Sequence, residues 1–212
     1  MTELVFILDR SGSMSGLEGD TIGGFNSIIE KQIKDDAEAV VTTVLFDDRI
    51  DRIHDRLPIR GVPELTEREY FVRGCTALLD AVGGTIRHIS KIHKYARPED
   101  KPSKTLFFIT TDGMENASRR YDYERVRKMI THEQEKYGWE FVFLGADIDV
   151  AREAKRMGVR PDRAFSYRKS RDGVDCMYSM ARRVVTAACA NETDEAISDI
   201  LKDFEESERN KK

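Results

Sequence analysis

Asp9, Ser11 and Ser13 form a short group of oxygen-bearing side chains that could bind a ligand together. They follow the apolar run of residues 4–8 at alternate positions, and Gly12 separates the two serines. An apolar run rich in Val, Ile and Phe is typical of a strand that is buried on both faces of a parallel sheet. Because open α/β sheets bind ligands at the carboxyl ends of their strands, we expect these three side chains at such an edge.

Two further oxygen donors are expected at the same edge. Asp112 directly follows a second strand that is predicted to be buried on both faces, over residues 104–111, and Thr76 lies just before a helix predicted to precede that strand. The combined group has two carboxylates and three hydroxyls, without an imidazole or a thiolate at its centre. Hard oxygen donors of low total charge favour Mg²⁺ or Mn²⁺, and Ca²⁺ less specifically. Since all of these groups cannot bind directly and leave an open position, some are expected to act through water.

Strands and helices alternate along the chain that must position these groups. The hydrophobic patterns predict strands over residues 4–8, 40–46, 49–54, 104–111, 139–144 and 163–167. They predict helices over residues 17–34, 78–95, 123–136, 150–157, 174–188 and 194–204. This alternation predicts an α/β fold with a doubly wound, mostly parallel sheet and helices on both faces. The charged tail after Glu205 is expected to fray.

Two features of individual elements add to this prediction. The strands over 40–46 and 49–54 are separated by a short acidic turn, which predicts an antiparallel hairpin. The second of these strands alternates charged and apolar residues, as expected at a sheet edge. Gly23 and Gly24 weaken the first half of the helix over 17–34, so we expect close backbone packing there.

Length, charge and cysteine content narrow the classes of protein. A chain of 212 residues suits one α/β domain. The net charge of −4 is too mild to indicate nucleic acid or an acidic membrane as a partner. The three cysteines have no metal-ligand or redox spacing, which favours free thiols in a reducing cytoplasm. The N-terminus has no signal-peptide pattern, and no apolar run approaches the roughly 18 residues of a membrane span.

The oxygen-bearing residues carry three motifs in order. These are Asp-x-Ser-Gly-Ser from Asp9 to Ser13, Gly-x-Thr ending at Thr76, and Thr-Asp-Gly around Asp112. Together they resemble the von Willebrand factor type A (VWA) domain with its metal-ion-dependent adhesion site (MIDAS), in a stand-alone intracellular form. The resemblance covers about residues 1–190. Residues 191–212 are expected to add a helix and a charged tail that pack on the same domain.

The resemblance implies a Rossmann-like sheet with one antiparallel edge strand, in agreement with the predicted hairpin. It implies a divalent cation bound by Asp9, Ser11, Ser13 and Thr76, with Asp112 binding directly or through water. It further implies a protein-binding role, in which an Asp or Glu of a partner protein fills the open coordination position. Neither the partner nor the oligomeric state is indicated by any residue of this chain.

Several residues near the motifs are interpreted separately. Arg10 is expected to be a plain surface residue, although it could steer acidic ligands. Glu115 and Asn116 are interpreted as solvated loop residues, although they could touch the edge that carries the site, and Asp47 is interpreted as part of a turn. Asp147 ends a further strand at the same edge, but it is not assigned to the site.

Cys75 occupies a position where many VWA domains have Gly. Its side chain could crowd or cap the site, but it leaves Thr76 in place.

Two other classes of function are weighed against protein binding. A metal-assisted hydrolase or phosphatase is the main alternative, because haloacid dehalogenase-like phosphatases also begin with a strand that ends in Asp. Those enzymes need a second Asp two residues later as general acid, and this chain has Ser11 there. Nucleotide binding is disfavoured, because neither Gly-x-Gly-x-x-Gly nor a P-loop follows any predicted strand. The sequence therefore favours a protein that is not an enzyme.

Overall fold

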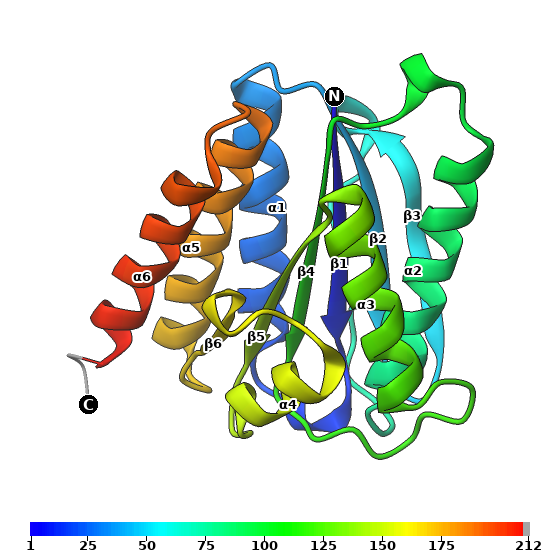
Figure 1. Ribbon diagram of the computed structural model, residues 1–212. Helices are drawn as coiled ribbons and strands as arrows, with labels where there is room; N and C mark the ends of the chain where they lie inside the picture. Colours follow the sequence, from blue (N-terminus) through cyan, green and yellow to red (C-terminus); the bar gives the residue numbers. More distant parts are fainter. Residues whose placement is uncertain (210–212) are drawn as a thin grey trace.

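The centre of the fold is a six-stranded sheet in the order β3-β2-β1-β4-β5-β6 (Figure 1). A computed structural model describes residues 1–209 of the chain. The strands are β1 Thr2–Asp9, β2 Ala39–Phe46, β3 Ile50–Pro58, β4 Lys104–Thr111, β5 Glu140–Gly145 and β6 Ala164–Ser166. All neighbouring strands pair in parallel except β2 and β3, which are antiparallel. The predicted mostly parallel sheet with an antiparallel edge strand is confirmed.

Helices cover both faces of this sheet. They are α1 Glu18–Lys34, α2 Leu78–Tyr95, α3 Tyr123–Tyr137, α4 Val150–Met157, α5 Arg171–Cys189 and α6 Asp194–Arg209. Short 3₁₀ turns lie at Gly12–Met14, Ile59–Gly61, Pro98–Asp100 and Pro161–Arg163. Helices α1 and α5 pack side by side on one face with α6 outside α5, while α2 and α3 lie on the other face (Figure 1). Within the described residues, no helix has the length and apolar character needed to cross a membrane.

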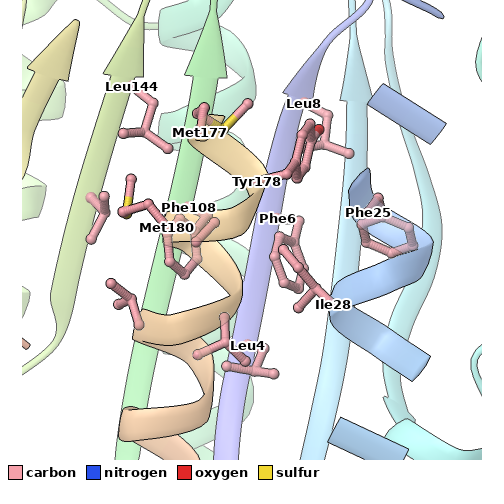
Figure 2. Close-up of a cluster of buried hydrophobic side chains, with 14 of the residues drawn as sticks. Leu4, Phe6, Leu8, Phe25, Ile28, Phe108, Leu144, Met177, Tyr178 and Met180 are labelled. Atoms are coloured by element: carbon pink, nitrogen blue, oxygen red, sulfur yellow. The ribbon is translucent and has the colours of Figure 1, made fainter. Parts of the chain in front are cut away.

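Strand β1 lies between β2 and β4 and is buried on both faces, as its apolar run predicts. Leu4, Phe6 and Leu8 face the α1 and α5 side, where Phe25 of α1 and Tyr178 of α5 pack among them (Figure 2). The alternate residues of β1 face the α2 and α3 side. Burial on both faces therefore fixes the strand that ends at Asp9.

Two details differ from the sequence-based prediction. The helix predicted over 123–136 extends to Tyr137, whose side chain is exposed. The tail was expected to fray after Glu205, but α6 continues to Arg209, and residues 210–212 lie outside the described part of the chain. Helix α6 buries Ile197, Leu201 and Phe204 in the same core as α5, because its apolar positions recur at helical spacing. The division of the chain at residue 190 stays a prediction.

Candidate metal centre

Asp9 lies at the carboxyl end of the central strand β1 with both carboxylate oxygens engaged. Oδ1 accepts a hydrogen bond from the backbone N–H of Ser11 at 2.7 Å, and Oδ2 accepts one from the hydroxyl of Thr111 at 2.6 Å. The first bond closes an Asx-type turn, which explains why the chain bends immediately after the strand. The second comes from β4, the neighbouring strand. The carboxylate is therefore fixed in orientation by two different elements.

The two serines connect this corner to Asp112. Their hydroxyl oxygens lie 3.0 Å apart, and the Ser13 hydroxyl donates to Oδ1 of Asp112 at 2.5 Å. Ser13 belongs to the 3₁₀ turn at Gly12–Met14, which follows β1. This turn presents the alternating hydroxyls at the carboxyl edge of the sheet, which is called the rim below. Asp112 itself is 4% exposed and directly follows β4. Residues from the ends of two strands thus meet at one place.

Thr76 reaches the same place from the loop that precedes α2. A Cβ atom added to Gly113 would lie 2.8 Å from Oγ1 of Thr76 and 3.3 Å from Oγ of Ser13. Both hydroxyls therefore line a space beside Gly113 that a larger residue would fill. The backbone N–H of Thr76 donates to Oδ1 of Asn116 at 2.9 Å, which ties the Thr76 loop to the Asp112 loop. All of the predicted site residues are brought to this rim.

The electrostatics of the centre favour a bound cation. Burial raises the pKa of Asp9 to about 6, the hydrogen bonds from Thr111 and Ser11 oppose this rise, and the charge of Asp112 adds to it. A buried carboxylate close to a second carboxylate is costly to ionise unless a positive charge compensates it. Oδ2 of Asp112 is buried and makes no hydrogen bond, although it pairs with a lysine described below.

The donor set matches a hard cation. Two carboxylates and three hydroxyls converge, and residues 1–209 contain no cluster of three or more His, Cys, Asp or Glu side chains arranged to hold a metal ion. Oxygen donors with only two negative charges suit Mg²⁺ or Mn²⁺, which commonly retain water or substrate ligands. The residues present therefore fit such an ion, with the ligand roles themselves remaining a prediction.

The interpretation of Arg10 as a plain surface residue is wrong. Its side chain is buried and pairs with Asp47 at 2.9 Å and with Asp51, while it donates to the carbonyl of Glu69 at 3.1 Å. Its partners lie on the β2–β3 hairpin and in the loop before α2, and none of them is a predicted ligand. Asp47 is likewise fully buried, and it also pairs with Arg73 at 2.6 Å. These ion pairs anchor the β2–β3 turn beneath the loop that carries Thr76.

Glu115 also differs from its interpretation as a solvated loop residue. It accepts hydrogen bonds from the backbone N–H groups of Leu79 at 2.8 Å, Ala117 at 3.0 Å and Ser118 at 2.8 Å. A carboxylate at the first turn of α2 satisfies a backbone donor that has no partner within the helix. Asn116 is exposed but holds Thr76, as described above. Both residues organise the loops of the rim rather than facing only solvent.

Two contributors to the rim were not identified from the sequence. Thr111 donates a hydrogen bond to Asp9. The sequence signal that could have identified Thr111 is its position at the end of a predicted strand, directly before Asp112. Lys169 reaches Asp112 from the loop between β6 and α5, and no local pattern marked it. Asp147 makes no contact with the predicted ligands in the described structure, and its carboxylate lies 4.0 Å from Lys169. Cys75 is exposed next to Thr76.

No protein-family model matches the sequence, and neither does any curated protein. Several solved structures match the fold. Proximal thread matrix protein 1 from the mussel byssus, with a zinc-occupied MIDAS motif, is 16% identical with a TM-score of 0.58, over 89% of this chain and 46% of that one. The chain thus spans about half the length of that protein.

Two further structures cover more of their own length. The vWF domain of the type V pili tip protein Mfa5 from Porphyromonas gingivalis is 9% identical with a TM-score of 0.59, over 89% of this chain and 96% of that domain. The manganese-loaded TRAP protein of Plasmodium vivax is 14% identical with a TM-score of 0.55, over 84% of this chain and 71% of that one. At these low sequence identities the likeness concerns the fold alone. The chain has the fold of a von Willebrand factor type A domain, as shown by its strand order, its antiparallel edge strand and these structural matches.

Proposed function

We propose that this chain is a divalent-metal-dependent protein-binding module. Asp9, Ser11, Ser13, Thr76 and Asp112 would hold Mg²⁺ or Mn²⁺, with Ca²⁺ less suited, and an Asp or Glu of a partner protein would complete the coordination. The observation that carries this proposal is the hydrogen-bonded group of Asp9, Ser11, Ser13 and Asp112 at the rim, in which both carboxylates are buried. The metal-loaded relatives of the same fold, one with zinc and one with manganese, support a divalent ion in this place.

The charge balance of the centre explains why an acidic partner would be preferred. Two carboxylates neutralise a divalent ion formally, but hydroxyl donors add no further negative charge. With Asp112 in contact with Lys169 as well, the rim would retain positive charge toward an incoming carboxylate. A partner Asp or Glu supplies both the missing charge and the missing oxygen ligand.

Arginines beside the rim add to this positive character. Arg49, Arg119 and Arg120 line a hollow beside the loop that carries Thr76, together with the carboxylates of Asp48 and Asp80. None of these arginines has an acidic side chain within ion-pair distance in the part of the chain that is described. Three arginines against two carboxylates leave the hollow with a net positive formal charge, and such a charge speeds the encounter with an acidic partner. An acidic partner surface is therefore proposed, with no role for nucleic acid or a membrane.

A catalytic role is less well supported by the same geometry. Ser11 stands where the phosphatase alternative needs a carboxylic acid. The histidines with polar contacts lie elsewhere: His54 contacts Thr43, His88 contacts Asp55 and His93 contacts Glu3. No described contact joins a histidine to the predicted ligands. We therefore propose a binding module rather than an enzyme.

A cytoplasmic location belongs to the same proposal. It rests on Cys75, Cys176 and Cys189, which form no disulfide.

Isothermal titration of Mg²⁺ and Mn²⁺ tests the metal centre. Wild type should bind either ion, and Asp9→Ala should weaken binding at least about tenfold. Asp199→Ala, an exposed position on α6, serves as the matched control and should bind like wild type. Equal affinities for wild type and Asp9→Ala would contradict the assignment of the site.

Two further experiments test the binding role. A partner captured from cell extract in Mg²⁺ should be lost in EDTA and on Asp9→Ala, whereas Asp199→Ala should retain it. A phosphatase and esterase screen tests the alternative. Metal-dependent turnover that Asp112→Asn abolishes would show that the chain is an enzyme.

A further inference from the structure

Lys169 brings a positive charge of the protein itself to the proposed metal centre. Its Nζ lies 3.0 Å from Oδ2 of Asp112, whose side chain is fully buried. That oxygen makes no hydrogen bond, while the other oxygen accepts from Ser13 at 2.5 Å. The Lys169 side chain is 28% exposed, so its ammonium approaches Asp112 from the solvent side. The one carboxylate oxygen of Asp112 left open by Ser13 thus faces a lysine.

The loop that carries Lys169 is held in place on both sides. The backbone N–H of Tyr167 donates to the carbonyl of Gly145 at the end of β5, at 2.9 Å. On the other side, Ser170 caps α5 by accepting from the N–H of Gly173 at 3.2 Å. A Cβ on Gly173 would lie 2.0 Å from the carbonyl oxygen of Arg168, so this turn requires glycine. The backbone from which the Lys169 side chain extends is therefore fixed by the fold, within reach of Asp112.

We infer that Lys169 acts as an internal cation that competes with the divalent ion for Asp112 and thereby lowers the metal affinity of the centre. This inference rests on the proposed metal-binding function. A divalent ion that uses Asp112, directly or through water, must share its carboxylate with the ammonium or displace it. Two positive charges on one carboxylate repel each other, and this repulsion is stronger in a buried site than in bulk water.

Asp147 offers the displaced ammonium a second partner. Its Oδ2 lies 4.0 Å from Nζ of Lys169, and its side chain is 65% exposed. A small rotation of the flexible lysine stem could therefore exchange the buried carboxylate for the exposed one. The competition would thus be reversible, and Asp112 would stay paired with a cation both with and without bound metal.

Titration of MgCl₂ and MnCl₂ into a set of lysine variants tests this inference. Lys169→Met removes the charge and keeps the length of the side chain, and Lys169→Arg keeps the charge. Arg171→Gln is the matched control, because it removes a positive charge two residues away on a side chain that is 80% exposed and pairs with Asp20. Asp9→Ala identifies the binding that belongs to the proposed centre.

Competition predicts that Lys169→Met binds Mg²⁺ about tenfold more tightly than wild type, with Lys169→Arg and Arg171→Gln close to wild type. An unchanged or weaker affinity of Lys169→Met would overturn the inference while leaving the metal centre intact. An equal gain in Arg171→Gln would also overturn it, since general surface charge would then be responsible. If neither wild type nor Lys169→Met shows binding that Asp9→Ala removes, the proposed function itself fails.

Thermal unfolding supplies a readout that does not depend on fitting a binding curve. In EDTA, Lys169→Met should unfold at a lower temperature than wild type, because Asp112 keeps a buried charge without its partner. Saturating Mg²⁺ should raise the melting temperature of Lys169→Met more than that of wild type, in proportion to its tighter binding. An equal Mg²⁺-induced shift in the two proteins would count against competition.

Discussion

The hydroxyl of Thr111 donates to the carboxylate of Asp9 at 2.6 Å and links the ends of the neighbouring strands β4 and β1. The same carboxylate accepts from the N–H of Ser11 on its other oxygen. A carboxylate held on both oxygens loses little further rotamer freedom when it binds an ion. The proposed metal centre would therefore be preorganised by a residue that need not touch the metal itself.

Replacement of Thr111 by Val should weaken Mg²⁺ binding. The variant keeps the shape of the side chain but removes the donor to Asp9, and loss of such a supporting contact typically costs about 10- to 100-fold in metal affinity. Calorimetric titration measures the change. Thr110→Val is the control, because Thr110 is its buried neighbour on β4 and has no side-chain hydrogen bond in the described structure. Wild-type affinity in Thr111→Val would show that Asp9 is positioned without this bond.

Alanine at adjacent glycines of α1 should have opposite effects on stability. A Cβ on Gly24 would lie 2.2 Å from Cγ of Tyr178 in α5, so Gly24→Ala should destabilise the fold by about 1–3 kcal/mol. A Cβ on Gly23 would meet nothing within 4 Å, so Gly23→Ala should stabilise it by about 0.5–1 kcal/mol. Denaturant unfolding compares the two variants. Changes of the same sign would refute close contact between the helices at Gly24.

Loss of the buried arginine next to Asp9 should destabilise the protein strongly. Arg10 pairs with Asp47 and Asp51 at 2% exposure, so Arg10→Met leaves Asp47 with Arg73 as its remaining cationic partner. Removal of one member of a buried ion pair costs about 3 kcal/mol or more. Arg171→Met, at an exposed position, should change the unfolding free energy by less than about 0.5 kcal/mol. A small effect of Arg10→Met in denaturant unfolding would indicate that Asp47 is satisfied without it.

The stability of the protein should contain a contribution from His54 that disappears in acid. Burial lowers the pKa of His54, with the charge of Glu69 acting in the opposite direction. In the unfolded chain a histidine takes up its proton near pH 6.5. Stability from the neutral ring is therefore present above about pH 6.5 and is lost as the pH falls through the lower folded-state pKa.

The measurement is the unfolding free energy at about pH 7.5 and about pH 5 in wild type and His54→Gln. Wild type should lose more stability on acidification than the variant, by the linkage above. His132→Gln replaces an exposed histidine and should keep the wild-type pH dependence. Parallel curves for wild type and His54→Gln would mean that the His54 ring is protonated equally in both states.

Most of the fold followed from local patterns. The run 4–8 is apolar throughout and the run 104–111 has an apolar centre over residues 106–109, and each proved to be part of a strand buried on both faces. The charged alternation over 49–54 correctly indicated the edge strand β3. Element ends were less accurate, as at α6, because helix termini depend on capping and on packing against neighbours.

The candidate site also contains features that local sequence patterns predicted and features that they did not. The sequence was enough to predict that the proposed ligands lie close together. Each of them follows a predicted strand or precedes a predicted helix, and parallel strands share one carboxyl edge. Arg10 was misjudged, because its two acidic partners lie 37 and 41 residues away and only strand pairing brings them near.

By itself, the sequence determined the alternation of strands and helices, the burial of β1 and the placement of oxygen donors at strand ends, since periodicity and motif spacing are properties of neighbouring residues. Only the tertiary structure decided how these donors are held and which charges they face. Thr111 contacts Asp9 across 102 residues of chain, and Lys169 reaches Asp112 from a distant loop. Contacts of this kind arise when the sheet is assembled, so no local pattern can specify them.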